Sequence, residues 1–226
     1  MDYCGQLLQD KFIDEVFRKK EGLIYLDIGA HNGKDLSNTY FLEKERGWMG
    51  ILVEPMIEAF NQLIENRDPN KNHFFNCALA DYNGEADFTQ VKDCGDIDML
   101  SGLTDNLDFR HHNRIIKEVS ESKQVLHPYE DGYIVKSKVQ VRTLTSICDE
   151  VGLYHFDFCS LDTEGSEFQI LKGIDYDKIK VSIFIVENNG YGSHHDIDPF
   201  LDQKGYIKYG NIAWDDVYIK RELVYA

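Results

Sequence analysis

Four acidic residues each come at the end of an apolar run, where a carboxylate could bind a ligand or take part in chemistry. Asp27 follows "LIYL", Glu54 ends "WMGILVE", Asp162 ends "FDFCSLD" and Glu187 ends "VSIFIVE". If these runs are parallel strands, their carboxyl ends meet at one edge of a sheet, where ligands of such sheets bind. Carboxylates gathered there can hold a cation, accept a proton from a hydroxyl or coordinate a divalent metal.

The stretch "LIYLDIGAHNGKDLSN" (residues 23–38) places a glycine-containing turn directly after the first of these runs. A dinucleotide-binding turn G-x-G-x-x-G starting at Gly29 would need glycines where this chain has His31 and Lys34. Asp27 would also face the pyrophosphate, and like charges about 4 Å apart cost roughly 1–4 kcal/mol, depending on the dielectric. The stretch therefore disfavours NAD and an oxidoreductase that depends on it.

S-adenosylmethionine (SAM) suits the same residues better, because it has an ammonium group, a sulfonium cation and no phosphate. Asp27 could hold the ammonium, directly or through water, and Gly29 and Gly33 would let the backbone turn closely beneath the methionine and ribose. Glu54 is placed to accept both ribose hydroxyls, although NAD enzymes use a similar acid.

The adenine is expected near Ala78 and Asp81, where a backbone N–H and a carboxylate could contact the ring edge. Asp81 lies in "DYNG", so a purely turn-forming role is an equal alternative. The full set of predicted cofactor-binding residues is Asp27, Gly29, Asn32, Gly33, Ser37, Glu54, Ala78 and Asp81.

The segment "SLDTEGSEF" (residues 160–168) supplies the candidate catalytic groups. Asp162 and Glu164 would lie beside the methyl group to be transferred. Two neighbouring carboxylates raise each other's pKa, which makes one of them a better base for an acceptor hydroxyl. Alternatively, Asp162, Glu164 and Glu187 bind a divalent cation, Mg²⁺ or another, that acidifies the hydroxyl.

Other polar residues are assigned lesser roles. His195, or its neighbour His194, could serve as a base or a metal ligand, and His195 is the one we predict to be catalytic. Glu167 is predicted to be a first-turn helix acid favoured by the helix dipole, and His111 and His112 to be surface residues. The C-terminal aromatic residues are predicted to pack against the sheet rather than to stack on an acceptor; they are Tyr206, Tyr209, Trp214 and Tyr218.

The elements that would hold these residues alternate between strands and helices, which predicts a mostly parallel sheet with helices on both faces. Strands are predicted at 23–29, 48–55, 72–81, 156–162 and 181–187, and helices within 1–20 and at 35–46, 56–67, 144–152 and 166–174. The face formed by Leu8, Phe12, Ile13, Val16 and Phe17 should pack the first helix.

The remaining segments complete a single α/β domain over residues 1–226. "EADFTQV" alternates between apolar and polar residues, which predicts a strand antiparallel to the one before it, with "YNG" as the turn between the two. "YIVKSKVQVRTL" is predicted to be a further strand. Residues 92–132 show no clear period except for a short helix near Ile115 and Ile116, and are predicted to form an acceptor-site insert or lid. An antiparallel pair around Gly210 and Asn211 should end the chain.

Composition narrows the class of protein further. The 226 residues carry a formal net charge of −16, which disfavours nucleic-acid binding because phosphate backbones are repelled. The five cysteines lack paired CxxC spacing, as expected for reduced thiols. No apolar run approaches the roughly 18 residues of a membrane span, and "MDYCGQLLQDKF" lacks a signal-peptide core. These features predict a soluble, cytoplasmic protein and leave its oligomeric state open.

Taken together, the motifs resemble the FkbM family of SAM-dependent methyltransferases over roughly residues 21–190. "LDIGAHNGKDLSNTYFLEKERGWMGILVEP" is similar to that family's glycine turn, first helix and ribose acid, and "NCALADYNGEADF" to its third strand and hairpin. "VRTLTSICDEVGLYHFDFCSLDTEGSEFQILKGI" resembles its D-x-E-G segment. The chain departs from the family at His31, Cys159 and Ser160, and residues 92–132 match no pattern of it, which leaves the acceptor open.

The resemblance implies a class I, Rossmann-like fold and methyl transfer from SAM to a hydroxyl, commonly one on a sugar, glycan or natural product. A small-molecule or glycan acceptor is therefore the predicted partner. Two alternatives remain: a cap-type RNA methyltransferase, which would want a basic groove with aromatic stacking, and a non-catalytic SAM-binding protein.

Overall fold

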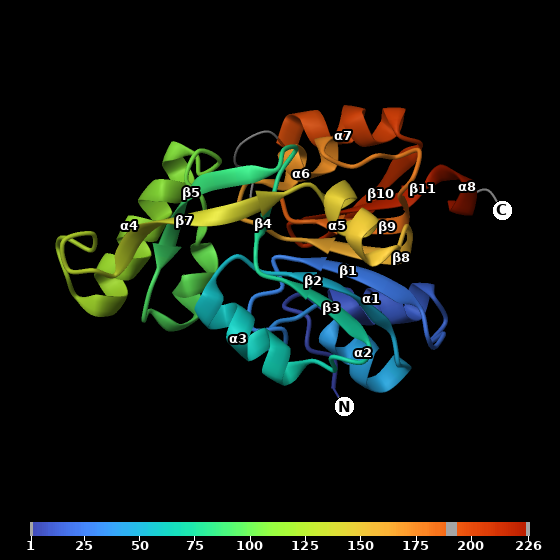
Figure 1. The fold of residues 1–226 in the computed structure, drawn as a ribbon, viewed down its shortest axis with the longest axis horizontal. Helices are drawn as coiled ribbons and strands as arrows, with labels where there is room; N and C mark the ends of the chain where they lie inside the picture. Colours follow the sequence, from blue (N-terminus) through green and yellow to red (C-terminus); the bar gives the residue numbers. More distant parts are fainter. Residues whose placement is uncertain (1, 189–193, 225–226) are drawn as a thin grey trace.

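A central seven-stranded sheet organises the molecule (Figure 1). The computed structural model describes residues 2–188 and 194–224, with the backbone alone at 194 and 195. The strand order is β10-β11-β9-β8-β1-β2-β3. The strands are β1 (Ile24–Ile28), β2 (Met49–Val53), β3 (Asn72–Phe75), β8 (His155–Leu161), β9 (Lys180–Val186), β10 (Tyr206–Ile212) and β11 (Asp215–Lys220). The first five are parallel, and β11 runs antiparallel to both of its neighbours, β9 and β10. This confirms the predicted mostly parallel sheet with a C-terminal antiparallel pair.

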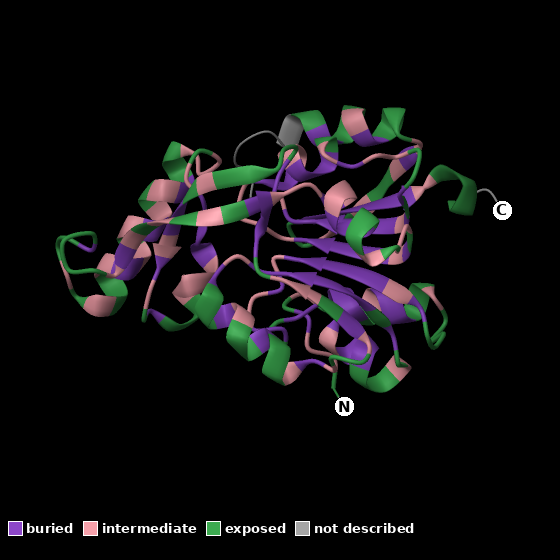
Figure 2. Ribbon diagram, in the orientation of Figure 1, coloured by how far each residue is buried: buried purple, intermediate pink, exposed green. Residues whose placement is uncertain are grey.

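Helices cover both faces of this sheet, as predicted, and the buried strands lie between them (Figure 2). One hydrophobic cluster packs α5 (Leu144–Val151), α6 (Glu167–Lys172) and α7 (His194–Gln203) on one face. A second packs α1 (Gln9–Val16), α2 (Tyr40–Arg46) and α3 (Ile57–Asn66) on the other. Because neighbouring strand residues point to opposite faces, Leu26 joins the first cluster and Tyr25 the second.

A second sheet, of order β4-β7-β5-β6, lies beside the central one (Figure 1). Its strands are β4 (Ala78–Leu79), β5 (Gly84–Val91), β6 (Gly102–Leu103) and β7 (Ile134–Arg142). The predicted hairpin around "YNG" is wrong: the antiparallel neighbours of β5 are β7 and β6, and β4 pairs with the other edge of β7. The segment at 72–81 is likewise divided, because β3 stays in the central sheet while β4 leaves it.

Residues 92–132 are more regular than their sequence suggested. They contain a 3₁₀ helix, η1 (Gly95–Leu100), the short strand β6 and the helix α4 (Phe109–Lys123). Asp108 caps α4 by accepting a hydrogen bond from the backbone N–H of His111 (2.9 Å). A separate hydrophobic cluster, including Ile115 and Val119 of α4, packs the insert against β5 and β7. The predicted short helix near Ile115 is thus a 15-residue helix.

Both ends of the chain differ from expectation. On α1 only Ile13 of the predicted apolar face is fully buried, and Leu8 and Val16 are exposed, because the helix buries polar side chains instead. At the other end, the turn between β10 and β11 lies at Ala213 and Trp214, not at Gly210 and Asn211. A four-residue helix, α8 (Arg221–Val224), follows.

Two further observations bear on the composition. All five cysteines are free in the structure. Among the helices of the described residues, no segment has both the length and the apolar character needed to cross a membrane.

Candidate active site

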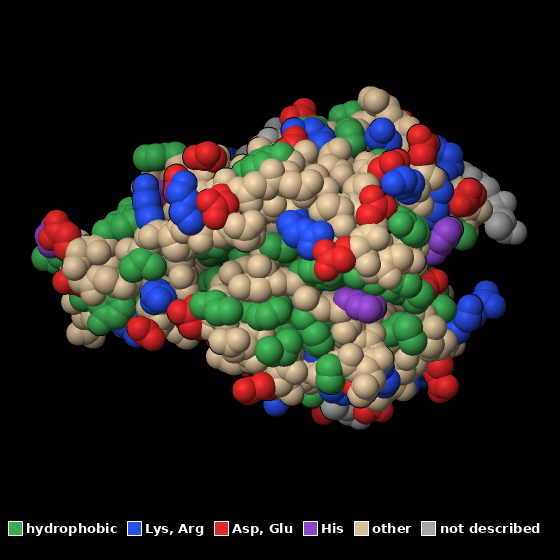
Figure 3. All heavy atoms as spheres, in the orientation of Figure 1, with side chains coloured by type: hydrophobic (Ala, Val, Ile, Leu, Met, Phe, Trp, Pro, Cys, Tyr) green, Lys and Arg blue, Asp and Glu red, His purple; other side chains and the backbone are tan. Residues whose placement is uncertain are grey.

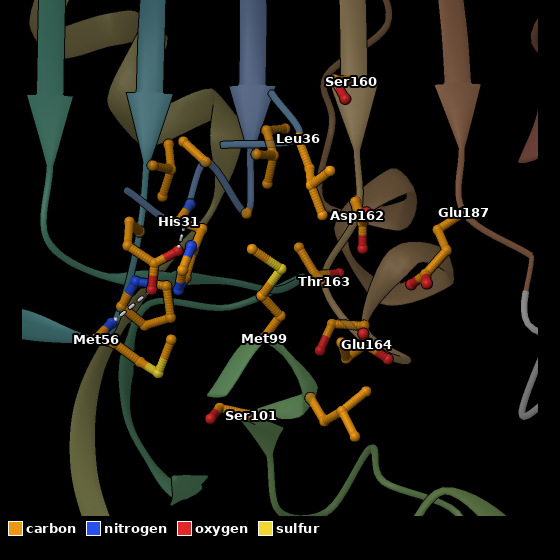
Figure 4. Close-up of a pocket in the computed structure, with 18 of the residues that line it drawn as sticks. His31, Leu36, Met56, Met99, Ser101, Ser160, Asp162, Thr163, Glu164 and Glu187 are labelled. Carbon is orange, nitrogen blue, oxygen red and sulfur yellow. Dashed lines mark hydrogen bonds between the residues drawn. The ribbon is translucent and has the colours of Figure 1, made fainter. Parts of the chain in front are cut away.

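A cavity of about 410 Å³ opens at the carboxyl edge of the central sheet (Figure 4). Its lining comes from the segments that follow β1, β2, β8 and β9, and from the insert. From β1 the chain proceeds to β2 and β3 on one side, whereas β8 and β9 lie on the other. The cavity therefore lies at the switch in strand order where open α/β sheets bind ligands.

Glu54 forms one side of the cavity and is almost fully buried. Its Oε1 accepts a hydrogen bond from the backbone N–H of Met56 (2.8 Å) and its Oε2 one from that of His31 (2.9 Å), drawn dashed in Figure 4. Burial raises the pKa of Glu54 to about 7. Each oxygen keeps acceptor capacity, so the carboxylate can receive two neighbouring hydroxyls at once.

Asp27 lines the cavity but has an internal partner that the sequence did not indicate. Arg67 places Nη2 3.3 Å from its Oδ2, and the hydroxyl of Thr39 donates to the same oxygen. Burial raises the pKa of Asp27, while the Arg67 guanidinium acts in the opposite direction. The binding of an ammonium group by Asp27 stays a prediction, and Arg67 already balances part of the charge of this carboxylate.

Glycine is required at two positions of the first turn, for different reasons. At Gly29, where φ is +84°, an added Cβ would lie 1.7 Å from the carbonyl oxygen of Asp162, so this glycine brings the β1 and β8 loops together. At Gly33, where φ is +71°, an added Cβ would collide with Leu63 of α3 at 2.2 Å. Asn32 stabilises the same turn, because its Oδ1 accepts from the backbone N–H groups of residues 34 and 35.

The predicted cofactor residues divide accordingly. Five of the eight line the cavity: Asp27, Gly29, Ser37, Glu54 and Ala78. Asn32 and Gly33 are absent from the lining and shape the turn behind it. Asp81 is not brought to the cavity either; it forms an ion pair with Lys172 (3.0 Å) with its side chain 35% exposed. The predicted helix at 35–46 begins only at Tyr40, which leaves Ser37 in a loop on the cavity wall.

Asp162, Glu164 and Glu187 come together on the opposite side of the cavity and point into one region (Figure 4). Their nearest carboxylate oxygens lie within 4.8 Å of one another. Burial, with neighbouring negative charges, raises the pKa of Asp162 to about 7 and holds those of Glu164 and Glu187 well above the ordinary value. Glu187 is hydrogen-bonded to Asp162. The cluster can therefore share at least one proton, held in the hydrogen bond between Asp162 and Glu187.

His111, expected at the surface, is buried and contacts this cluster from α4. Its Nδ1 lies 3.4 Å from Oε2 of Glu164, and its Nε2 lies 3.0 Å from the carbonyl oxygen of Leu100. A carbonyl only accepts, so Nε2 carries a proton, and Nδ1 of the neutral ring can accept one from Glu164. His111, Ile115 and Val119 are spaced four residues apart on one helix face, a pattern that could have revealed its burial.

Glu167 holds the loop that presents these acids, beyond the dipole role predicted for it. Its Oε1 accepts hydrogen bonds from the backbone N–H and hydroxyl of Thr163 (2.9 and 2.8 Å) and from the N–H of Gly165 (3.1 Å). Glu164 has a φ of +58° and Gly165 one of +112°. These strained positions are stabilised by a buried carboxylate, as is typical of functional loops.

Of the predicted catalytic histidine, His195, the structure describes the backbone alone. His195 lies in the first turn of α7, and its side chain falls outside the described residues. Arg114 of α4 and Trp214 of the β10–β11 turn are among the lining residues that the sequence analysis did not select as site residues.

The central sheet has seven mostly parallel strands, a C-terminal antiparallel pair and a cavity at the switch point. This arrangement is the Rossmann-like fold of class I methyltransferases. The chain belongs to the FkbM methyltransferase family: residues 27–208 match the model of the methyltransferase FkbM domain. The predicted family is confirmed. Membership implies the general use of SAM as the methyl donor.

The chain is similar to two known proteins. It is 28% identical over 162 residues to the 2-O-methyltransferase NoeI of Sinorhizobium fredii (strain NBRC 101917 / NGR234), a match that covers 69% of this chain and 58% of that protein. The crystal structure of methyltransferase FkbM from Methylobacillus flagellatus KT aligns with a TM-score of 0.45 at 14% identity, covering 88% of this chain and 43% of that one. The chain thus spans little more than half the length of NoeI.

Proposed function

We propose that this chain transfers the methyl group of SAM to a hydroxyl of a sugar or glycan. One observation carries the proposal: a single cavity holds Glu54, suited to a ribose diol, on one side and three proton-sharing carboxyl groups on the other. The name of NoeI, a 2-O-methyltransferase, supports a hydroxyl as the acceptor in this family.

The residues of the cavity fit SAM. His31 Nδ1 and Asn38 Oδ1 are buried polar atoms on its lining with no hydrogen-bond partner among the described residues, as expected of groups that await a polar ligand. Glu54 would accept the ribose hydroxyls and Asp27 the ammonium. When bound, SAM supplies an electrophilic methyl group on a sulfonium.

The carboxyl cluster supplies the acid–base chemistry. Asp162, with a pKa of about 7, is half ionised at neutral pH and can take the proton of the acceptor hydroxyl. Burial and neighbouring negative charges favour the protonated forms of Glu164 and Glu187, which can donate hydrogen bonds to neighbouring hydroxyl oxygens. The insert (92–132) contributes Met99, Leu100 and Arg114 to the lining, which supports its assignment as part of the acceptor site.

A divalent cation is the alternative role for the same cluster. Three carboxylate oxygens within 4.8 Å of one another are suitable ligands for Mg²⁺. Asp162, Glu164 and Glu187 would hold the ion, and it would acidify the acceptor hydroxyl. Metal binding by this cluster stays a prediction, and activity measured with a chelator distinguishes the metal-binding role from the acid–base role.

The test is methyl transfer from labelled SAM to a saccharide panel, compared between the wild type, Asp162→Asn and Asp81→Asn. Removing a general base typically costs about 10²–10⁴-fold in turnover, so we expect Asp162→Asn to lose that much and to bind SAM within about threefold of the wild type. Asp81→Asn removes an equal charge outside the cavity and should be unchanged. Full turnover by Asp162→Asn would contradict the proposal, and loss of turnover with EDTA, restored by Mg²⁺, would assign the metal role.

A further inference from the structure

Among the residues that the structure describes, Trp214 is the exposed aromatic residue that lines the cavity. Its side chain is 47% exposed. The C-terminal aromatics were predicted to pack the sheet, and Tyr206 and Tyr218 do, being 1% and 2% exposed. Tyr209 is 61% exposed but lies outside the cavity lining. Trp214 therefore presents a large apolar surface at a ligand site, where the loss of that surface to solvent would contribute to binding.

The register of the sheet places Trp214 at the acidic end of the cavity. β11 runs antiparallel to β9 with Asp216 opposite Val186, so continuing the register by two residues brings Trp214 level with Asn188, directly after Glu187. Neighbouring hydrogen bonds hold this turn: Gln9 donates to Asp215 (2.6 Å) and Asn188 to Asp216 (2.7 Å). These hydrogen bonds hold the backbone next to Trp214, whereas its indole is exposed and can contact a ligand.

The charge of the cavity selects among acceptors. Arg114 is the one lysine or arginine in the lining that the structure describes, and it forms an ion pair with Glu118 (2.7 Å), itself a lining residue. Asp35 and Asp96 add negative charge to the lining, as does Asp162 when it is ionised. A carboxylated or phosphorylated sugar would be repelled here, whereas neutral hydroxyls can donate to carboxylates.

We propose that Trp214 is an acceptor-binding residue whose indole stacks on the apolar face of an uncharged pyranose ring, whose hydroxyl then reaches Asp162. The inference rests on the proposed function and adds to it the class of acceptor and the residue that recognises it. The packing predicted for the C-terminal aromatics holds for Tyr206 and Tyr218, whereas Tyr209 and Trp214 are exposed.

Tryptophan fluorescence gives a direct readout, because the chain has two tryptophans and the other, Trp48, is 1% exposed. The holoenzyme loaded with S-adenosylhomocysteine is titrated with the methyl glycosides of glucose, galactose and mannose, and with methyl glucuronide as the charged counterpart of the glucoside. We expect a saturable change with neutral pyranosides, lost in Trp214→Phe, and weaker binding of the glucuronide.

Kinetics provide the second arm. For the pyranoside that the wild type methylates best, Trp214→Ala should raise the acceptor KM about tenfold or more with kcat and the SAM Kd within about twofold. Trp214→Tyr should largely restore KM, and Tyr209→Ala, which truncates a more exposed aromatic on β10 outside the lining, should match the wild type. An unchanged KM in Trp214→Ala, no fluorescence response to any pyranoside, or preference for the glucuronide would each overturn the inference. Pyranoside binding at Trp214 without any methyl transfer would instead contradict the proposed function.

Discussion

Burial of carboxyl groups determines what individual residues of the cavity can do. Burial raises the pKa of Glu54 and that of Asp162 to about 7, and it raises the pKa of Glu164 and Glu187 well above the ordinary value. Glu54 accepts hydrogen bonds from two backbone N–H groups, and in the proposed function its charged form would accept the ribose hydroxyls.

We therefore predict that SAM binding weakens as the pH falls through about 7. Between pH 8 and 6 the ionised fraction of a group with this pKa falls about tenfold, and the Kd for SAM, measured calorimetrically, should rise by a similar factor. Glu54→Gln should bind more weakly and show a flatter pH profile. An unaltered profile in Glu54→Gln would assign the titration to another group. The folding stability of the ligand-free protein depends on pH in the opposite direction. Because the pKa of Glu54 is about 7 in the folded protein against an ordinary 4.5, folding favours its protonated form. The contribution of Glu54 to stability is therefore fully present below pH 4.5 and is lost as the pH rises through 7.

The acids around the cavity could be predicted from the sequence because Asp27, Glu54, Asp162 and Glu187 come at the ends of apolar runs. Five of the eight predicted cofactor residues line the cavity. It could not identify the partners those acids find in space. Arg67 lies 40 residues from Asp27 in the chain, and His111 more than 50 residues from Glu164. Such contacts depend on tertiary packing, which local patterns do not encode.

At the scale of elements, Arg67 joins three parts of the fold beneath the cavity. It lies at the C-terminus of α3, fully buried in its side chain, and its guanidinium contacts Asp27 of β1 (3.3 Å) and Glu43 of α2 (3.0 Å). Its Nε also donates to the carbonyl of Gly33 (2.6 Å). The first turn, the first strand and two helices are thus held by one side chain.

Arg67→Met should consequently destabilise the fold by about 3–5 kcal/mol, because two buried carboxylates lose their counter-charge. Urea unfolding measures the change. The matched control is Arg110→Met: Arg110 is 61% exposed and pairs with Asp108, so its loss should cost about 0–1 kcal/mol. Equal stability of the two variants would show that Arg67 is dispensable.

The elements that sequence patterns predicted well are those with continuous apolar runs, β1, β2, β8 and β9. The second sheet was missed because β5 finds its partner β7 more than 40 residues later, beyond the nearest turn. The helix α4 was under-predicted because only a few apolar residues, Ile115 and Val119 among them, mark its buried face.

At the scale of the whole molecule, charge and cavity give a consistent account. The net charge is −16, and on the face shown in Figure 3 lysines and arginines are scattered among acidic side chains rather than gathered in a stripe. The lining has Arg114 as its one described lysine or arginine. A pyrophosphate or an RNA chain finds little positive charge here, whereas a cationic donor and a neutral acceptor match the site.

Thermal unfolding with competing cofactors tests this account most directly. A ligand at about 100 times its Kd stabilises the folded state by ~2.7 kcal/mol, which for a chain of this size raises the Tm by roughly 5–10 °C. We predict such a shift with SAM and with S-adenosylhomocysteine and none with NAD at the same concentration. A shift with NAD alone would contradict the central claim, because it would mean that the cavity holds a pyrophosphate after all.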